Sequence, residues 1–446
     1  MTDASPNVAD PPNGAPSTGA TPTEAATRIG ALDALRGIAV LGIFAVNIIG
    51  FALPGPGFAF PRITGGDGLL NYGLWTFVEF YMEGSMRGLF SLLFGASVIL
   101  FTERRPPDGA TAGIATLYYR RTSSLILFGL IHAYVLLMPG DILLIYGIAG
   151  LFMFPIRNAS PRSLMIAAAA IAAAFMAFSA IEEIPEISET REITELESRL
   201  AGGATLNEDE QARIDAWRED REWRSPAAQQ REIAERTGDI ATLYMSNAAF
   251  VGDNSSISGL IWWAIDAAMM MMLGMALFRT GVLTGDRSRE FYVRLMIAGY
   301  AVGLSLRAFG LWERWDADFS PLVATPWILQ QPARIALTLG HVGLFFLLWR
   351  AFHAKLPFRA LGAAGRMAFS NYIGQTVIAN LIFTSVGLGL FGSLVRWQIY
   401  LLMASIWIAQ LAFSMLWLAR FRFGPLEWAW RSLIYWRRPT LRRAPA

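Results

Sequence analysis

Residues 31–53 read ALDALRGIAVLGIFAVNIIGFAL, and only Asp33 and Arg36 carry charge in this run of 23 residues. A helix needs about 20 mostly apolar residues to cross the hydrocarbon core of a bilayer. Lipid offers no hydrogen-bond partner to a free backbone N–H or C=O group, so a spanning segment of this kind must be helical. The stretch therefore predicts a membrane-spanning helix.

Other segments have the same apolar character, which predicts an all-α, polytopic membrane protein with about ten transmembrane helices. Residues 68–83 are aromatic and amphipathic, which indicates an interfacial or half-buried helix between the first two spans. The nine further spans are expected at residues 85–102, 120–138, 142–157, 163–181, 257–279, 291–311, 333–352, 367–389 and 396–419.

The composition of the chain agrees with this class. Of its 446 residues, 54% are hydrophobic and 16% are charged, whereas a soluble globular protein carries about 25% charged residues. The chain has no cysteine, which excludes a disulfide framework, a thiolate metal site and a cysteine nucleophile. The formal net charge of +2 gives no reason to expect a nucleic-acid partner. No metal site is expected either.

The distribution of basic residues predicts the orientation, because Lys and Arg in short loops favour the cytoplasmic side. With the N-terminus inside, 23 of them lie in cytoplasmic segments. Only six lie in short outer segments, namely Arg62, Arg87, Arg307, Arg314, Arg334 and Arg396. Both termini are therefore expected in the cytoplasm.

This orientation divides the chain into five regions. The insertion at 182–256 is acidic and poor in apolar residues, and it is interpreted either as a cap over the outer face or as a solvated connector. The regions are a disordered cytoplasmic tail at 1–27, an N-terminal five-helix half at 28–181, the extracytoplasmic helical insertion at 182–256, a C-terminal five-helix half at 257–421, and an interfacial basic tail at 422–446.

His132 and Asp141 form the most informative polar pair. His132 lies near the outer end of the third span, and Asp141 follows a short turn and opens the fourth. A carboxylate beside an imidazole fixes the ring's tautomer and raises its basicity, as general-base catalysis requires. In the alternative interpretation the histidine is buried and satisfied by its neighbours, while Asp141 is the N-cap of the fourth span.

Asp33, Arg36 and Asn47 are the polar residues of the first span. Asp33 and Arg36 are one helical turn apart and can pair at the inner boundary. This pair either fixes the insertion depth or docks an anionic phosphate group, which arginine recognises in a forked geometry. Asn47, three turns further in, is expected to form a helix–helix hydrogen bond or to contact a ligand.

Four polar residues of the C-terminal half are further candidates for a binding site. Asp266 lies midway along an apolar span, so it must be protonated, paired or facing water, and it would suit a proton-coupled transporter. Ser370, Asn371 and Gln375 lie within about two turns at the start of the ninth span. They either line a polar pocket or hydrogen-bond across helices.

Several long motifs give the chain a family resemblance. They resemble the DUF418, or YeiB-like, family of bacterial inner-membrane proteins over nearly all of residues 28–436. The motifs are LDALRGIAVLGIFAVNI (32–48), LFSLLFGAS (89–97), FGLIHAYVLLMPGDILLIYGIAGL (128–151), DAAMMMMLGMALFRTG (266–281), GRMAFSNYIGQT (365–376) and FGPLEWAWR (423–431). The resemblance implies a multi-pass protein of the bacterial inner (cytoplasmic) membrane.

The opening motif is also similar to that of membrane acyltransferases, including the acyltransferase-3 enzymes and the lysosomal heparan glucosaminide N-acetyltransferase. Those enzymes move an acyl group from cytoplasmic acyl-CoA to an acceptor, so the resemblance implies a transmembrane acyltransferase. In acyltransferase-3 enzymes a histidine of the first span is central. This chain has Asn47 and no histidine in that span, so His132 would have to take the role from another helix.

Two activities therefore follow as hypotheses, with a scaffold that catalyses no reaction as a third. In the first, Asp33 and Arg36 help to hold acyl-CoA, and His132, oriented by Asp141, deprotonates a small-molecule or glycan acceptor. In the second, Asp266 and His132 are the protonation sites of a proton-coupled transporter. The expected partners are the lipid bilayer, the acceptor and a second copy of the chain in a homodimer.

Overall fold

The computed structural model describes residues 22–103, 112–138, 140–254, 256–316, 319 and 328–443. Within these ranges the regular secondary structure is helical, apart from one isolated bridge between Phe421 and Arg442. The helices are α1 (Pro22–Ala52), η1 (Gly55–Gly57), α2 (Leu69–Tyr81), α3 (Ser85–Thr102), α4 (Ile114–Tyr134), α5 (Ile142–Met153), α6 (Pro161–Ala201), α7 (Glu208–Asp220), η2 (Glu222–Arg224), α8 (Pro226–Thr237), α9 (Ile240–Asn254), α10 (Ile257–Arg279), α11 (Arg289–Asp316), α13 (Gln330–Phe352), α14 (Leu356–Arg366), α15 (Ala368–Phe383), α16 (Arg396–Arg420) and α17 (Pro425–Tyr435).

The all-α prediction is confirmed for these residues, and a helix lies over each of the ten expected spans. In the part of the chain that the structure describes, seven helical segments are long and apolar enough to cross a membrane. They are Gly30–Ala52, Leu69–Thr102, Pro161–Ala201, Ile257–Arg279, Arg289–Asp316, Gln330–Phe352 and Arg396–Arg420. The expected spans at α4, α5 and α15 are not among these seven.

Some boundaries differ from the predicted ones. Helix α1 begins at Pro22, inside the expected tail at 1–27, whose first 21 residues lie outside the described ones. Helix α6 continues to Ala201, past the expected end at 181, and includes Pro185. Helix α15 ends at Phe383 rather than near 389.

Helix α1 packs against several others inside the bundle, including α3, α14, α15 and α16. Glycines allow the closest of these contacts. A Cβ atom on Gly37 would overlap the carbonyl of Leu361, and one on Gly365 would overlap the carbonyl of Asp33. The small residues at this crossing therefore let the backbones of α1 and α14 touch.

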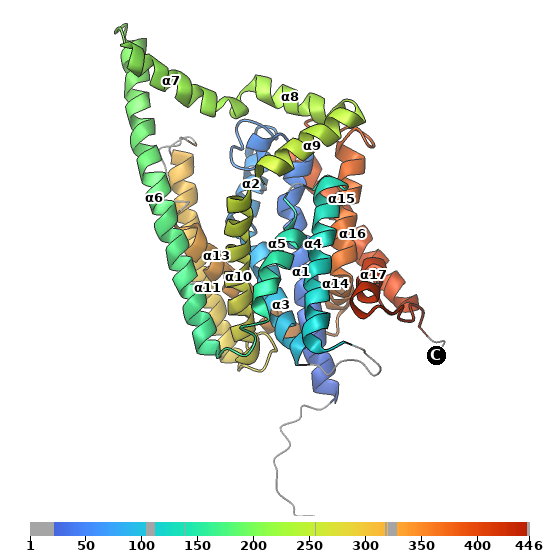
Figure 1. Ribbon diagram of the computed structural model, residues 1–446. Helices are drawn as coiled ribbons and strands as arrows, with labels where there is room; N and C mark the ends of the chain where they lie inside the picture. Colours follow the sequence, from blue (N-terminus) through green and yellow to red (C-terminus); the bar gives the residue numbers. More distant parts are fainter. Residues whose placement is uncertain are drawn as a thin grey trace, which may run out of the picture.

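Helices α7, α8 and α9 lie across one end of the bundle, while the start of α1 and the C-terminal end lie at the opposite end (Figure 1). Hydrogen bonds tie the insertion to the bundle. The Glu232 carboxylate accepts from the backbone N–H of Gly55 at 2.9 Å. Asn247 and Tyr244 of α9 donate to the carbonyls of Ala133 and Val135, both at 3.0 Å. These contacts hold α8 and α9 against that end of the bundle.

Candidate functional site

The predicted pair of His132 and Asp141 is formed. Nδ1 of His132 lies 2.7 Å from Oδ1 of Asp141. The other carboxylate oxygen accepts the backbone N–H of Leu144 at 2.8 Å, so Asp141 is also the N-cap of α5. One carboxylate oxygen of Asp141 therefore contacts the imidazole, and the other caps α5.

Helix α15 adds two side chains that the sequence did not single out. Thr376 Oγ1 lies 2.8 Å from His132 Nε2. Tyr372, one turn earlier, points its hydroxyl at Oδ1 of Asp141, 3.4 Å away. We call Asp141, His132, Thr376 and Tyr372 the histidine relay. The network assigns the tautomer: Nδ1–H donates to the carboxylate, and Nε2 accepts from the threonine hydroxyl.

Gly129 makes this arrangement sterically allowed. It precedes His132 by three residues in α4 and faces the first turn of α5. A Cβ atom at this position would lie 2.6 Å from Oδ2 of Asp141 and would overlap the backbone nitrogen of Leu144. Only glycine therefore lets α5 approach α4 closely enough for the carboxylate to reach the imidazole.

The relay is enclosed by protein. His132 is 0% exposed and Thr376 is 1% exposed. The ring of Tyr372 packs edge-on against the imidazole, with centroids 5.0 Å apart. Both imidazole nitrogens are satisfied by neighbours, so in this conformation the histidine contacts no open space.

A cavity of about 290 Å³ adjoins the α4–α5 turn. Its wall includes Gly140 and Ile142, the two neighbours of Asp141 in the chain, but neither His132 nor Thr376. We call it the charged cavity because of its polar lining. The polar lining residues come from α1, α2, the α2–α3 connection, α3, α11 and α13, and they are Asn47, Glu79, Glu83, Arg87, Arg314 and Gln330.

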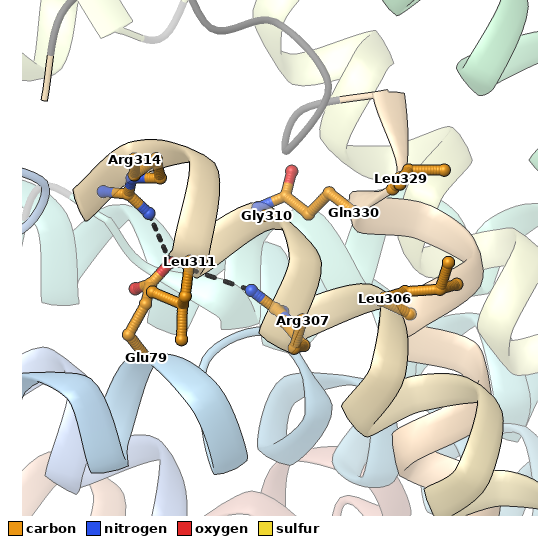
Figure 2. Close-up of a pocket in the computed structure, with 9 residues that line it drawn as sticks. Glu79, Leu306, Arg307, Gly310, Leu311, Arg314, Leu329 and Gln330 are labelled. Carbon is orange, nitrogen blue, oxygen red and sulfur yellow. Dashed lines mark hydrogen bonds and ion pairs between the residues drawn. The ribbon is translucent and has the colours of Figure 1, made fainter. Parts of the chain in front are cut away.

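Ion pairs between distant parts of the chain surround this cavity. Glu79 lies 3.0 Å from Arg314 and 3.7 Å from Arg307, and these three side chains line a smaller adjoining pocket (Figure 2). Asp266 is held by both terminal nitrogens of Arg334, one of them at 2.7 Å, and by the amide of Gln331 at 3.0 Å. Asp266 is thus a paired carboxylate and not a solitary one.

The connection between α2 and α3 depends on Gly84, whose φ of +66° lies in the left-handed region. A Cβ atom there would lie 2.9 Å from Cδ of Arg334. The glycine therefore lets the chain turn between Glu83 and Arg87 and leaves room for Arg334 behind the turn.

The polar residues of α1 lie at two depths. Asp33 and Arg36 form the expected ion pair at 2.8 Å. Asn47 lines the charged cavity. Because a helix rises about 1.5 Å per residue, Arg36 and Asn47 are roughly 16 Å apart along α1. The inner ion pair and the charged cavity are therefore separate places in the bundle.

The polar residues of α15 form helix contacts. Ser370 donates to Glu427 of α17, Asn371 donates to Ser414 of α16, and Gln375 donates to Gln410 of α16. None of the three lines the larger or the smaller of the two cavities described above. This arrangement agrees with the hydrogen-bonding interpretation of these side chains.

The residues that the sequence analysis misses have only weak local signals. The arginine distribution assigns Arg87, Arg307, Arg314 and Arg334 to outer segments, but Arg307 and Arg334 are buried. Thr376 ends the GRMAFSNYIGQT motif, yet nothing local indicates that it faces His132. Among the described residues, no three His, Asp or Glu side chains gather as metal ligands would.

Comparison with known proteins gives relatives along almost the whole chain. It is 28% identical to the uncharacterized protein YxaH of Bacillus subtilis (strain 168) over 422 residues, covering 93% of this chain and 96% of that protein. It is 28% identical to the uncharacterized protein YeiB of Escherichia coli (strain K12) over 408 residues, covering 90% and 95%. No solved structure matches. Residues 277–437 match the family described as a protein of unknown function, DUF418. The predicted resemblance to the DUF418, YeiB-like family is thereby confirmed, over residues 277–437 by the family match and over at least 90% of the chain by these two relatives.

Proposed function

We propose that this integral membrane protein transfers an acyl group from cytoplasmic acyl-CoA to an envelope or small-molecule acceptor. The observation that carries the proposal is the chain of contacts from Asp141 through His132 to Thr376, at 2.7 and 2.8 Å. A carboxylate, an imidazole and a hydroxyl in this order are the components of an activated nucleophile. The resemblance of the opening motif to membrane acyltransferases supports the same activity.

The relay supplies a balanced reaction in two steps. In the first, His132 Nε2 takes the proton of Thr376, whose oxygen attacks the thioester carbonyl, and the thiol of CoA leaves with that proton. In the second, the acceptor hydroxyl or amine gives its proton to His132 and attacks the threonine ester. The acylated acceptor leaves, and the proton returns to Thr376. Asp141 stabilises the imidazolium formed in each step.

The proposal includes a topology of ten spans in the bacterial inner membrane with both termini in the cytoplasm. The arginine distribution supports it, and the start of α1 lies at the same end of the bundle as the C-terminal end. Arg36, paired with Asp33, lies toward this end and would bind phosphates of the donor. The extended pantetheine arm of acyl-CoA would then reach along α1 toward the relay.

Access to the relay requires the turn between α4 and α5 to move, because His132 is fully buried. This turn contains Leu137, a buried non-glycine residue with φ of +57°. Left-handed conformations of such residues store roughly 1–3 kcal/mol and cluster at functional sites. We place the opening at this turn, between the relay and the charged cavity.

The test is covalent labelling of purified protein in proteoliposomes with radiolabelled acetyl-CoA. We expect an acetyl ester at Thr376 by peptide mass spectrometry, and none in Thr376→Val or His132→Ala. Thr376→Ser should keep the label, and Val377→Ala, at an exposed position of the same helix, is the matched control. Undiminished acyl transfer by His132→Ala would remove the relay from the mechanism.

A proton-coupled transporter is the second candidate function, favoured by the charged cavity inside the bundle. Asp266 and His132 would be its protonation sites. In this case Asp266→Asn should change the pH dependence of solute uptake into proteoliposomes. Uptake that is insensitive both to pH and to this substitution would exclude the candidate.

A further inference from the structure

Most charges around the charged cavity are already paired. Arg314 and Arg307 both contact Glu79, and Arg307 also donates to the backbone carbonyl of Glu83 at 2.8 Å. Asp266 and Arg334 neutralise each other. These groups stabilise the wall of the cavity and need no ligand.

Two opposite charges in the cavity wall are not paired. Among the described residues, no hydrogen bond or ion pair within 4.0 Å engages the carboxylate of Glu83 or the guanidinium of Arg87. Arg87 instead lies over the ring of Trp263, with its Cζ 4.6 Å from the ring centroid, and its Nε is buried without a partner. Charged groups in a bundle interior are costly unless they are paired, so both are available to a ligand.

The balance of charge in the cavity wall also restricts which ligands fit. Two acidic side chains, Glu79 and Glu83, face two arginines, Arg87 and Arg314, in the cavity wall. The charges of the wall balance, which favours a ligand that carries one cationic and one anionic group. The amides of Asn47 and Gln330 add neutral hydrogen-bonding groups to the same wall.

The size of the cavity limits the ligand to a small molecule or a headgroup. A volume of 290 Å³ corresponds to about ten water molecules at their share of liquid volume. Apolar side chains, including Ile43, Val46 and Met86, form the rest of the wall. They suit a short hydrocarbon link between two charged groups.

We propose that the charged cavity binds a small zwitterion, with its ammonium group at Glu83 and its anionic oxygens at Arg87. Either a soluble zwitterion or the headgroup of a zwitterionic phospholipid has this chemistry. The inference concerns binding and goes beyond acyl transfer, so it does not depend on the histidine relay.

The experiment uses the purified full-length protein and O-phosphoethanolamine as the soluble probe. Binding is measured by calorimetry in detergent, with ethanolamine and inorganic phosphate as probes that each carry half of the zwitterion. In parallel, thermal unfolding is compared in nanodiscs of phosphatidylethanolamine and of phosphatidylglycerol. Wild type should bind phosphoethanolamine more tightly than ethanolamine or inorganic phosphate if the ligand is soluble. It should be more stable in phosphatidylethanolamine than in phosphatidylglycerol if the ligand is a lipid headgroup.

The variants E83Q and R87M test the assigned contacts. Each should weaken binding by about tenfold or more, as the loss of one ion pair worth roughly 1.4 kcal/mol predicts. E290Q and R294M are matched controls, because they alter an exposed ion pair of α11, and they should bind like wild type. Equal binding by wild type, E83Q and R87M would overturn the proposal. If either variant fails to fold, the wild type alone still tests the proposal. A wild type that prefers neither phosphoethanolamine nor phosphatidylethanolamine would also overturn it.

Discussion

Glu427 of α17 caps the first turn of α15 through Ser370. Its Oε1 accepts the backbone N–H groups of Phe369 and Ser370 at 2.8 and 3.0 Å, and its Oε2 accepts the Ser370 hydroxyl. A carboxylate at a helix N-terminus satisfies backbone donors that have no partner within the helix, and it also meets the positive end of the helix dipole. The helix that carries Tyr372 and Thr376 is thus anchored by the interfacial tail.

Glu427→Ala should destabilise the protein by about 1–3 kcal/mol, because it leaves buried donors of α15 without an acceptor. Ser370→Ala removes one of these hydrogen bonds and should cost about 1 kcal/mol. Thermal unfolding in detergent measures both effects. Equal stability of Glu427→Ala and wild type would show that the cap contributes nothing.

The buried carboxyl of Glu427 predicts that the stability of the protein depends on pH. Burial raises the pKa of the Glu427 carboxyl above its ordinary value, against the opposing effect of its hydrogen bonds. The folded state then binds the proton of Glu427 more tightly than the unfolded state does. The contribution of this proton to the free energy of unfolding therefore falls as pH rises from the ordinary pKa to the raised one. The difference in Tm between wild type and Glu427→Gln should therefore decrease as pH rises through that window. A difference that increases with pH would contradict this assignment.

Gly84→Ala should destabilise the protein more than Gly68→Ala does. Both glycines have positive φ, so alanine strains the backbone at either position. Only at Gly84 does the added Cβ also press on Arg334, since nothing lies within 4 Å at Gly68. The Tm values of the two variants measure this difference. An equal decrease in Tm would show that the Arg334 side chain moves aside at no cost.

Asp266→Asn should cost about 3–5 kcal/mol, because it leaves Arg334 buried without its counter-charge. Replacing both partners, as in Asp266→Leu with Arg334→Met, should recover most of this loss, since two apolar side chains need no partner. Unfolding of Asp266→Leu, Arg334→Met and the double variant completes the cycle. A double variant no more stable than Asp266→Asn would argue against a simple pair.

The absence of cysteine makes the topology directly testable. A single cysteine at the exposed position Glu219 of α7 should react with a membrane-impermeant maleimide in intact spheroplasts. A cysteine at Arg438, which is exposed near the C-terminus, should react only after permeabilisation. Labelling of Arg438→Cys without permeabilisation would place the C-terminus outside.

The parts that the sequence predicts well are those that local physics determines. The bilayer requires apolar helices of a given length, so a helix lies over every expected span. His132 and Asp141 are nine residues apart across one turn, and this proximity makes their contact predictable. A carboxylate midway along an apolar span is expected to be protonated, paired or facing water, and Asp266 is paired. Its partner is 68 residues away and has no local signal.

The missed residues depend on contacts between distant segments. Thr376 is 244 residues from His132, and Arg314 is 235 residues from Glu79. Arginine counts assign a loop to one side of the membrane, but they do not distinguish a solvated side chain from one that packs inward. The charged cavity therefore emerges only when the helices are assembled.

The two anchor points of the insertion have a mechanical consequence. Glu232 of α8 holds Gly55, just after α1, whereas Asn247 and Tyr244 of α9 hold the last carbonyls of α4. Because the insertion is attached at both places, a displacement at the end of α4 is transmitted to the segment around Gly55. If the backbone around Leu137 shifts to uncover the imidazole, the strain passes through α9 and α8 to the loop that follows α1, where Phe58 and Ala59 border the charged cavity.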